Sequence, residues 1–274
     1  MPQPAAVKRH YAREGLAEQI LEALRAAGLD PDRLTVDDLA PVDEFHIRGR
    51  TATEELAALA EPARGQRLLD VGCGLGGTAR YLAARIGVEV VGVDLTPEYC
   101  RLGSMLTERV GLADRIEFRA ADALELPFGD GSFDQIWTEH LTMNIADKPR
   151  LFRQLRRVAR VGGRLAFHEV VAGPGGEIHF PVPWAPGPEI SFLVPADELR
   201  ATVERGGWRV LAWRDATAPA LTWFRQRAAA LAGTPPTLGF HLLLGADARP
   251  MFANQVRNLA ECRIALVQAV AEAS

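Results

Sequence analysis

The stretch Arg67-Leu68-Leu69-Asp70-Val71-Gly72-Cys73-Gly74-Leu75-Gly76-Gly77 decides the fold of this chain. An apolar strand over 67–71 contains an acidic residue near its end, and a run of glycines leads into a helix over 76–86. Glycines at such a bend permit positive φ and let a ligand approach the backbone closely. The helix start offers free N–H groups. The stretch therefore predicts a small-molecule site on the first strand-to-helix turn of an open α/β sheet.

Two classes of ligand compete for this turn. Gly72, Gly74 and Gly77 satisfy the dinucleotide pattern, and Asp94 follows at about the spacing of 20 residues that the pattern requires. The carboxylate of Asp70 argues against a dinucleotide, because it would repel a pyrophosphate at a helix start that favours anions. The same carboxylate suits a ligand with an ammonium group, such as S-adenosylmethionine. The simpler alternative is that Asp70 only caps the helix.

Three further strands are predicted over 88–93, 115–120 and 133–138. Asp94 ends the first of them and can accept hydrogen bonds from both hydroxyls of a ribose. Asp122 ends the second and can accept from an adenine amine, with the backbone of Ala123 near the ring. Consecutive parallel strands present such acids at one edge of the sheet. This pattern is more specific than the glycines alone, and it favours S-adenosylmethionine.

At these residues the chain resembles the class I S-adenosylmethionine-dependent methyltransferases, and within them the small-molecule branch that includes ubiquinone/menaquinone and sarcosine/dimethylglycine methyltransferases. The resemblance covers about residues 45–215. The matching segments are Asp70–Gly77, Gly92–Asp94, Ala121–Ala123 with Leu126-Pro127-Phe128, Phe133-Asp134, and Arg160–Leu165. The resemblance implies an α/β fold with an open, doubly wound, mostly parallel seven-stranded sheet of Rossmann-like type.

The predicted organisation has four parts. Residues 1–62 form a helical segment that closes over the cofactor, with a helix over 12–27 and a polar connector over 31–41. Residues 63–216 form the cofactor-binding core, which includes an active-site loop over 171–194. Residues 217–262 form a helical cap, interrupted at Thr234-Pro235-Pro236, and 263–274 form the last strand and the C-terminus. The competing interpretation of the C-terminus is one continuous helix over 247–272.

The predicted cofactor site extends beyond the glycine-rich turn. Arg48 could pair with the cofactor carboxylate, or it could form an ordinary surface salt bridge. The residues expected to bind the cofactor are Asp70, Gly72, Gly74, Gly76, Asp94, Leu95, Asp122, Ala123, Thr138, His46, Arg48 and Tyr11.

The candidate catalytic residues lie at strand ends, and they are His140, Glu169 and His168. His140 follows the fourth strand, where the acceptor is expected, although it could instead pack against the next helix. As a base it needs to be neutral, and an unperturbed histidine titrates near pH 6.5, so the rate should rise with pH there. Strand alternation points only one of His168 and Glu169 toward the pocket.

Substrate contacts are expected from Glu139, Trp184, Trp223 and His241. Together with Phe224, Phe240 and Met251, the two tryptophans could form an apolar roof over the acceptor, or they could simply pack the cap onto the core. A roof with so many aromatic side chains suits an acceptor with an apolar or cationic body.

Composition is that of an ordinary soluble enzyme. The chain has 274 residues and a formal net charge of −4, which gives no reason to expect nucleic acid or an anionic membrane as a partner. No apolar stretch reaches about 18 residues, and the N-terminus lacks an apolar signal segment. The cysteines are scattered rather than spaced as metal ligands, which fits a reducing cytoplasm and no bound metal. A homodimer is compatible with these features.

The sequence therefore predicts methyl transfer from S-adenosylmethionine to nitrogen, oxygen or carbon of a small molecule, such as an amino-acid-derived, quinone or secondary metabolite. Three alternatives remain open. One is the same fold and cofactor with a non-methylating natural-product reaction such as a cyclisation. The others are a nicotinamide-dependent oxidoreductase, which Asp70 disfavours, and a cofactor sensor without catalysis.

Overall fold

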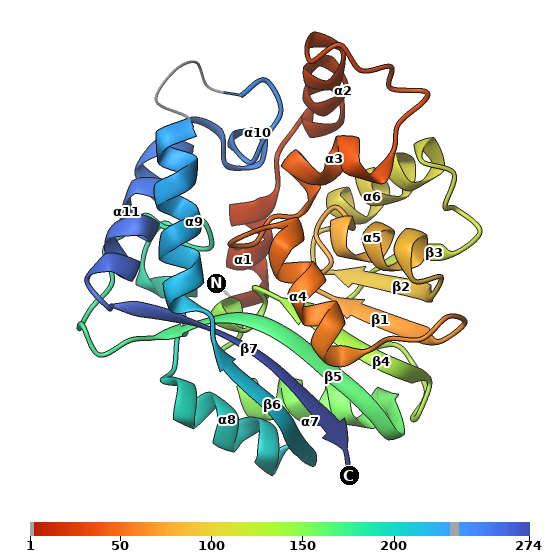
Figure 1. Ribbon diagram of the computed structural model, residues 1–274. Coiled ribbons are helices and arrows are strands. Elements are labelled where there is room, and N and C mark those ends of the chain that lie inside the picture. The colour runs from red at the N-terminus through yellow and green to blue at the C-terminus, as the bar shows by residue number, and fades with distance from the viewer. Residues whose placement is uncertain (1–2, 231–235) are drawn as a thin grey trace.

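A computed structural model describes residues 3–230 and 236–274 of the chain. Its centre is a seven-stranded sheet in the order β3-β2-β1-β4-β5-β7-β6 (Figure 1). The strands β1 to β5 run parallel, and β7 is antiparallel to both β5 and β6. The bounds are β1 Arg67–Val71, β2 Glu89–Asp94, β3 Ile116–Ala120, β4 Phe133–Glu139, β5 Ala159–Ala172, β6 Trp208–Asp215 and β7 Ile264–Ala273. The predicted fold class is confirmed.

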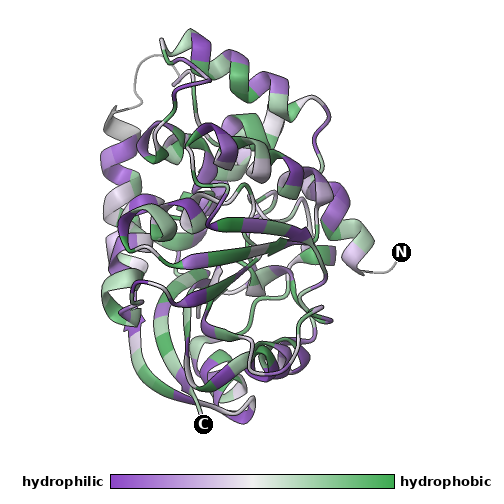
Figure 2. Ribbon diagram, turned by 90° about the vertical axis from the view of Figure 1, so that its right-hand side faces the viewer, coloured by the Kyte–Doolittle hydropathy of each residue, from purple (hydrophilic) through white to green (hydrophobic). Residues whose placement is uncertain are grey.

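Helices cover both faces of the sheet. On one face, α4 (Arg50–Ala60) and α5 (Gly77–Arg85) pack apolar side chains against β1, β2 and β4. On the other face, α7 (Lys148–Val158) and α8 (Ala196–Arg205) pack against β1, β4 and β5. The central strands carry many of the hydrophobic residues, and hydrophilic ones alternate around the outer helices (Figure 2). Burial on both faces explains why β1 and β4 are almost continuously buried strands.

The helix α7 shows how local sequence sets an element. The Asp147 side chain accepts a hydrogen bond from the backbone N–H of Arg150 and so caps the helix start. Pro149 is tolerated in the first turn, because that position needs no intrahelical donor. The buried apolar positions, spaced as one face of a helix, are Leu151, Phe152, Leu155 and Val158.

The N-terminal segment is more helical than predicted. It contains α1 (Gln3–Tyr11), α2 (Leu16–Ala26) and α3 (Val36–Asp43), followed by α4. The polar connector predicted over 31–41 is therefore wrong, because α3 occupies half of it. The signal for this helix was present, since Thr35 and Asp38 form a capping box in which each side chain accepts from the other's backbone N–H.

The C-terminal part departs from the sheet and returns to it. After β6 the chain forms α9 (Thr217–Ala230), α10 (His241–Leu244) and α11 (Ala248–Ala260), and then β7. These helices stand at one side of the molecule, across α1 from α3 and α4 (Figure 1). The strand prediction for the C-terminus is confirmed, and the continuous helix over 247–272 is wrong. Part of the predicted break at 234–236 lies outside the described residues. Of the helices described, none combines the length and the apolar character needed to cross a membrane.

The expected loop over 171–194 begins at the end of β5 and contains the one-turn 3-10 helix η2 (Pro188–Ile190). Its backbone is tied to the core, because the N–H of Phe192 donates to the carbonyl of Met143 at 2.7 Å. Val182 and Trp184 of this loop are buried in the same apolar cluster as Phe224 of α9. The loop is therefore an ordered wall, and α9 packs against it.

Candidate functional site

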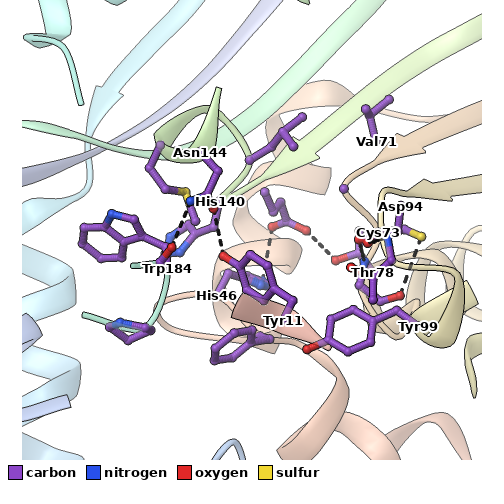
Figure 3. Close-up of a pocket in the computed structure, with 18 of the residues that line it drawn as sticks. Tyr11, His46, Val71, Cys73, Thr78, Asp94, Tyr99, His140, Asn144 and Trp184 are labelled. Atoms are coloured by element: carbon purple, nitrogen blue, oxygen red, sulfur yellow. Dashed lines mark hydrogen bonds and ion pairs between the residues drawn. The ribbon is translucent and has the colours of Figure 1, made fainter. Parts of the chain in front are cut away.

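A pocket of about 1340 Å³, including space open to solvent, lies at the carboxyl ends of β1, β2 and β4. β1 has β2 on one side and β4 on the other, so this edge is the switch point at which α/β sheets bind ligands. The pocket has two ends (Figure 3). The glycine end is formed by Asp70, Gly72, Gly74, Asp94 and Asp122, and the histidine end by Tyr11, His46, His140, Asn144 and Trp184.

At the glycine end, the backbone fixes the carboxylate of Asp94. The N–H of Gly74 donates to Oδ2 at 3.0 Å, and the N–H of Thr96 donates to Oδ1 at 2.8 Å. Gly74 has φ +54°, and a Cβ added there would meet no described atom within 4 Å. The loop therefore leaves free space beside a carboxylate whose remaining lone pairs can accept further hydrogen bonds.

The carboxyl group of Asp70 lies beside this loop. Burial, and then the charge of Asp94, raise the pKa of Asp70 to about 7. Its Oδ2 is buried and has no hydrogen-bond partner among the described residues. A buried acceptor left without a partner is costly, so this atom marks a place where a ligand with a cationic or donor group would bind.

Two glycines of the same run serve packing rather than the pocket surface. A Cβ at Gly76 would lie 2.4 Å from the ring of Phe118, and Gly76 does not line the pocket. A Cβ at Gly77 would lie 2.5 Å from the carbonyl oxygen of Asp43. Because Gly77 has no side chain, the end of α3 can approach the start of α5. Gly72, Leu95 and Ala123 line the pocket, as does Asp122, whose carboxylate accepts from the N–H of Leu124 at 2.8 Å.

A buried ion pair connects α3 to α5, next to the glycine-rich loop. Arg80 in α5 is fully buried, and its Nη2 and Nε lie 2.7 and 3.2 Å from Oδ2 of Asp43. The guanidinium also donates to the carbonyls of Leu75 and Gly103 and to Oγ1 of Thr107. This ion pair was not predicted from the sequence. The feature that could have revealed it is an arginine on the inward face of an otherwise apolar helix.

The histidine end brings together three imidazoles from distant segments. The ring centroid of His46 lies 6.1 Å from that of His140 and 6.1 Å from that of His168, and the last two are 5.1 Å apart. Burial lowers the pKa of His46 to about 3 and of His168 to about 4, and holds the pKa of His140 well below 6.5. All three rings are therefore neutral near pH 7.

Glu139 joins the histidines to the start of α5. Nε2 of His46 lies 3.3 Å from Oε1 of Glu139, and the Thr78 hydroxyl donates to Oε2 at 2.5 Å. Burial raises the pKa of Glu139 well above its ordinary value. The carboxyl group is therefore held in place from two sides, and it lines the pocket beside His140 in the chain.

His140 occupies a strained backbone position. Its φ is +56°, which is uncommon among residues other than glycine although histidine adopts it more often than most, and its N–H donates to the carbonyl of His168 at 2.8 Å. Its Nε2 is buried without a hydrogen-bond partner among the described residues. Strain of this kind collects at functional sites. His140 lines the pocket.

Glu169 and His168 lie behind the pocket rather than on its surface. The carboxylate of Glu169 accepts from the hydroxyls of Thr138 and Thr142 and from the N–H groups of Leu141 and Thr142, at 2.9 to 3.0 Å. Nε2 of His168 lies 3.1 Å from the carbonyl of Ile47. None of Glu169, His168 and Thr138 lines the pocket. The direct ligand contacts expected of them are not seen, because they lie behind the pocket. Glu169 and Thr138 serve the turn after β4, and Nε2 of His168 contacts the chain before α4.

Other predicted residues also divide between the pocket and its surroundings. Arg48 does not reach the pocket and forms an ion pair with Glu55 on α4. His241 also lies outside the lining, whereas Trp184 and Trp223 are part of it. Among the further aromatics proposed for the roof, Phe224 and Phe240 line the pocket and Met251 does not.

Tyr11 reaches the pocket through a network that the sequence did not reveal. Its hydroxyl donates to Oδ1 of Asn144 at 2.9 Å, and Nδ2 of Asn144 donates to the carbonyls of Trp184 and Ile190 at 2.9 and 2.8 Å. Asn144 thus joins α1 to the loop over 171–194, through its contacts with Trp184 and Ile190 (Figure 3). Lining residues missed by the sequence predictions include Asp43, Glu44, Tyr99, Asn144, Phe252 and Gln255.

The buried histidines make stability depend on pH in a defined direction. Burial lowers the pKa of His168 to about 4, whereas the unfolded chain takes up a proton near pH 6.5. Stability from this group is complete above pH 6.5 and is lost as the pH falls toward 4, because the unfolded state then binds more protons. We expect urea unfolding to show that the wild type loses up to about 1.4 kcal/mol per pH unit more than His168→Gln in this range.

The matched control for this measurement is His179→Gln, whose side chain is partly exposed and paired with Glu261 at the surface. The free energy of unfolding of this variant should change with pH as it does in the wild type. Parallel pH curves for the wild type and His168→Gln would show that His168 is protonated in the folded protein.

Comparison with known proteins agrees with this geometry. Residues 69–167 match the family described as "Methyltransferase domain". The chain is 35% identical over 161 residues to the methyltransferase GfsG of Streptomyces halstedii, which is 56% of each chain. Its fold is similar to that of geranyl diphosphate C-methyltransferase from Streptomyces coelicolor A3(2), solved with Mg²⁺, geranyl diphosphate and S-adenosyl-L-homocysteine. That match has a TM-score of 0.72 and 20% identity, and covers 100% of this chain and 98% of the other.

A second solved structure of the same fold has a different reaction in its name. The cyclase SpnF matches with a TM-score of 0.64 and 22% identity, over 93% of this chain and 92% of that one. The aligned regions span less than two thirds of the length of the first curated relatives. The resemblance to class I methyltransferases that was predicted from the sequence is confirmed.

Proposed function

We propose that the protein transfers a methyl group from S-adenosylmethionine to a small-molecule acceptor, as the match of residues 69–167 to a family of methyltransferase domains suggests. The observation that carries this proposal is the glycine end of the pocket. There, a buried and unpartnered carboxyl oxygen of Asp70 lies beside a loop that holds the carboxylate of Asp94 open to the pocket.

The residues at the glycine end fit the functional groups of this cofactor. Asp70 would bind its ammonium group, Asp94 its ribose hydroxyls, and Asp122 with Ala123 its adenine. The bound cofactor supplies an electrophilic methyl group on a sulfonium. The role of the protein is then to hold the acceptor close and aligned, which alone supplies much of the rate.

The histidine end would hold the acceptor. His140 lines this end with a neutral imidazole and can take up the proton that leaves an acceptor. Glu139 and His46 contact each other beside it and would position the reacting groups. We further propose that 1–62 closes over the cofactor, that 217–262 caps the acceptor, and that the protein is cytoplasmic. A homodimer is part of the same proposal.

Cyclisation is the second candidate function. It is supported by the similarity of this fold to that of a solved cyclase. Mass spectrometry of the product decides between the two. Methyl transfer increases the mass of the acceptor by one methylene and releases S-adenosylhomocysteine in equal amount. A product of unchanged mass would instead support the cyclisation.

The binding of cofactor is expected to depend on Asp94. Asp94→Ala removes the acceptor of two ribose hydrogen bonds, and at about 1–1.5 kcal/mol each we expect roughly a 30-fold to 150-fold loss of affinity for S-adenosylhomocysteine. Isothermal titration calorimetry on the purified protein measures this directly.

Asp114→Ala is the matched control, because Asp114 is exposed in the turn before β3. It should bind like the wild type. If Asp94→Ala folds with an unchanged affinity, Asp94 is not part of the cofactor site. If the wild type itself does not bind S-adenosylhomocysteine, the proposed function is wrong.

A further inference from the structure

From the charges around the histidine end we infer that the acceptor is an uncharged molecule with an apolar body, and that its reacting group is a hydroxyl. This inference rests on the proposed function and narrows it. An uncharged acceptor excludes anionic acceptors, which carry a phosphate or a carboxylate, and it also excludes acceptors that carry an ammonium group.

An anionic acceptor would find no counter-charge in the pocket. None of the described residues that line it is a lysine or an arginine. The residues outside the described ranges, Met1-Pro2 and Leu231–Pro235, also contain neither. Several cations lie just outside the lining, and their charged groups are engaged elsewhere. Arg48, Arg50 and Arg80 are paired with Glu55, Glu44 and Asp43. Arg13 and Lys148 donate to backbone carbonyls, and Arg227 stacks over the ring of Trp223.

The histidines do not replace these missing cations. Burial holds the pKa values of His46, His140 and His168 well below 7. The charge of His168 further lowers the pKa values of His46 and His140, and the charge of Arg48 lowers that of His168. A phosphate or carboxylate that entered this end would lose its water without gaining an ion pair.

A cationic acceptor is equally poorly matched. The acidic residues of the pocket lie mostly at the glycine end or at the end of α3, where Asp43 and Glu44 each use one carboxylate oxygen to pair with an arginine. Their other oxygens are buried, without a hydrogen-bond partner among the described residues. Glu139 is the carboxyl group closest to the histidines, and it is already engaged by Thr78 and His46. Burial also raises its pKa well above the ordinary value, because the charged form of this carboxyl group is poorly solvated there.

The remaining surface suits an apolar body with one polar group. Trp184, Trp223, Phe224 and Phe252 line the pocket and belong to the same apolar cluster as Tyr11, and Phe240 lines the pocket as well. The polar groups among them, Tyr11, Asn144 and Gln255, are uncharged. A hydroxyl is the reacting group that such a site can serve, because a neutral imidazole can accept its proton.

The transfer then balances without another reactant. With the cofactor bound, the acceptor oxygen would form a bond to the methyl carbon as the carbon–sulfur bond breaks, and the electron pair of that bond would remain on sulfur. The proton of the hydroxyl passes to the neutral imidazole of His140. The products are a methyl ether, S-adenosylhomocysteine and an imidazolium, which releases its proton to solvent.

Three probes with one apolar body test this inference: 4-phenylbutanol, 4-phenylbutylamine and 4-phenylbutyrate. Calorimetry on the protein saturated with S-adenosylhomocysteine gives the dissociation constant of each. We expect the alcohol to bind about tenfold tighter or better than the ammonium and the carboxylate, because each charged end must lose its water without a partner.

Each other result overturns the inference. Tighter binding of the carboxylate would show a cation in the site, and tighter binding of the amine would show that the aromatic wall or Glu139 recognises ammonium groups. Equal or absent binding of all three probes would show that the pocket does not select a neutral body. Binding of S-adenosylhomocysteine is measured first, so a failure of the proposed function is distinguished from a failure of the acceptor class.

A charge introduced at Gln255 gives a second, independent readout. Gln255 on α11 is buried and lines the pocket, so Gln255→Arg places a cation there, and Gln255→Met is the uncharged control. We expect Gln255→Arg to reverse the preference toward 4-phenylbutyrate, while Gln255→Met keeps the preference for the alcohol. If Gln255→Arg leaves the preference of the wild type unchanged, charge does not decide which acceptor binds.

Discussion

Arg80→Met is expected to lower the free energy of unfolding by about 3–5 kcal/mol, because it leaves the carboxylate of Asp43 buried without its partner. Arg80 is fully buried and also donates to the carbonyls of Leu75 and Gly103. One substitution thus removes an ion pair and several hydrogen-bond donors from the junction of α3 and α5. Urea unfolding followed by circular dichroism measures the loss.

Two variants separate the ion pair from a general effect on α5. Arg85→Met changes an arginine of the same helix that is exposed and paired with Asp37, so it should cost less than about 1 kcal/mol. Arg80→Met combined with Asp43→Leu removes both buried charges and should be more stable than Arg80→Met alone. If the double variant is the less stable of the two, the uncompensated charge of Asp43 is not the cause.

His140→Asn is expected to reduce kcat by about 100-fold or more if His140 accepts the proton of the acceptor. Asparagine is the suitable replacement, because it tolerates the positive φ of this position but cannot act as a base at neutral pH. Formation of S-adenosylhomocysteine, with an acceptor found by screening, gives the rate. Affinity for S-adenosylhomocysteine should stay within a few-fold.

The pH profile sharpens this test. Burial lowers the pKa of His140 well below 6.5, so the wild-type rate should already be independent of this group above that pH. The rise near pH 6.5 expected from an ordinary histidine is thereby moved to more acidic values. His179→Asn is the matched control and should be fully active. A His140→Asn variant that has normal activity and only a lower melting temperature would make His140 a structural residue.

The strands that build the pocket could be predicted because their signals are local. The acid and the glycines after 67–71 determine the first turn, and Asp94 and Asp122 follow at strand ends that parallel pairing brings to one edge. The strand over 264–273 was recognisable from its continuous apolar sequence, although only its place between β5 and β6 excludes a helix. The helix α3 was missed because its capping box lies in a polar stretch.

The histidine end was less predictable, because it depends on contacts between residues far apart in the chain. His46 precedes α4, His140 follows β4, and His168 lies on β5, and nothing in their spacing indicates that the rings meet. The same holds for Tyr11 and Asn144, which are joined by a hydrogen bond. Glu169 shows the opposite error. Its position at a strand end suggested chemistry, but local backbone donors engage its carboxylate.

The pairing of β6 with β7 has an evolutionary consequence. The two strands form a hairpin whose register runs from Trp208 opposite Ala273 to Asp215 opposite Val267, and α9, α10 and α11 are inserted at its open end. Because the hairpin alone fixes where this insert leaves the sheet and returns to it, its length and sequence can diverge without disturbing β1, β2 and β3. In such a chain the insert can be exchanged between homologues. The exchange would change which acceptor is selected, and the half of the sheet with β1, β2 and β3 would stay the same.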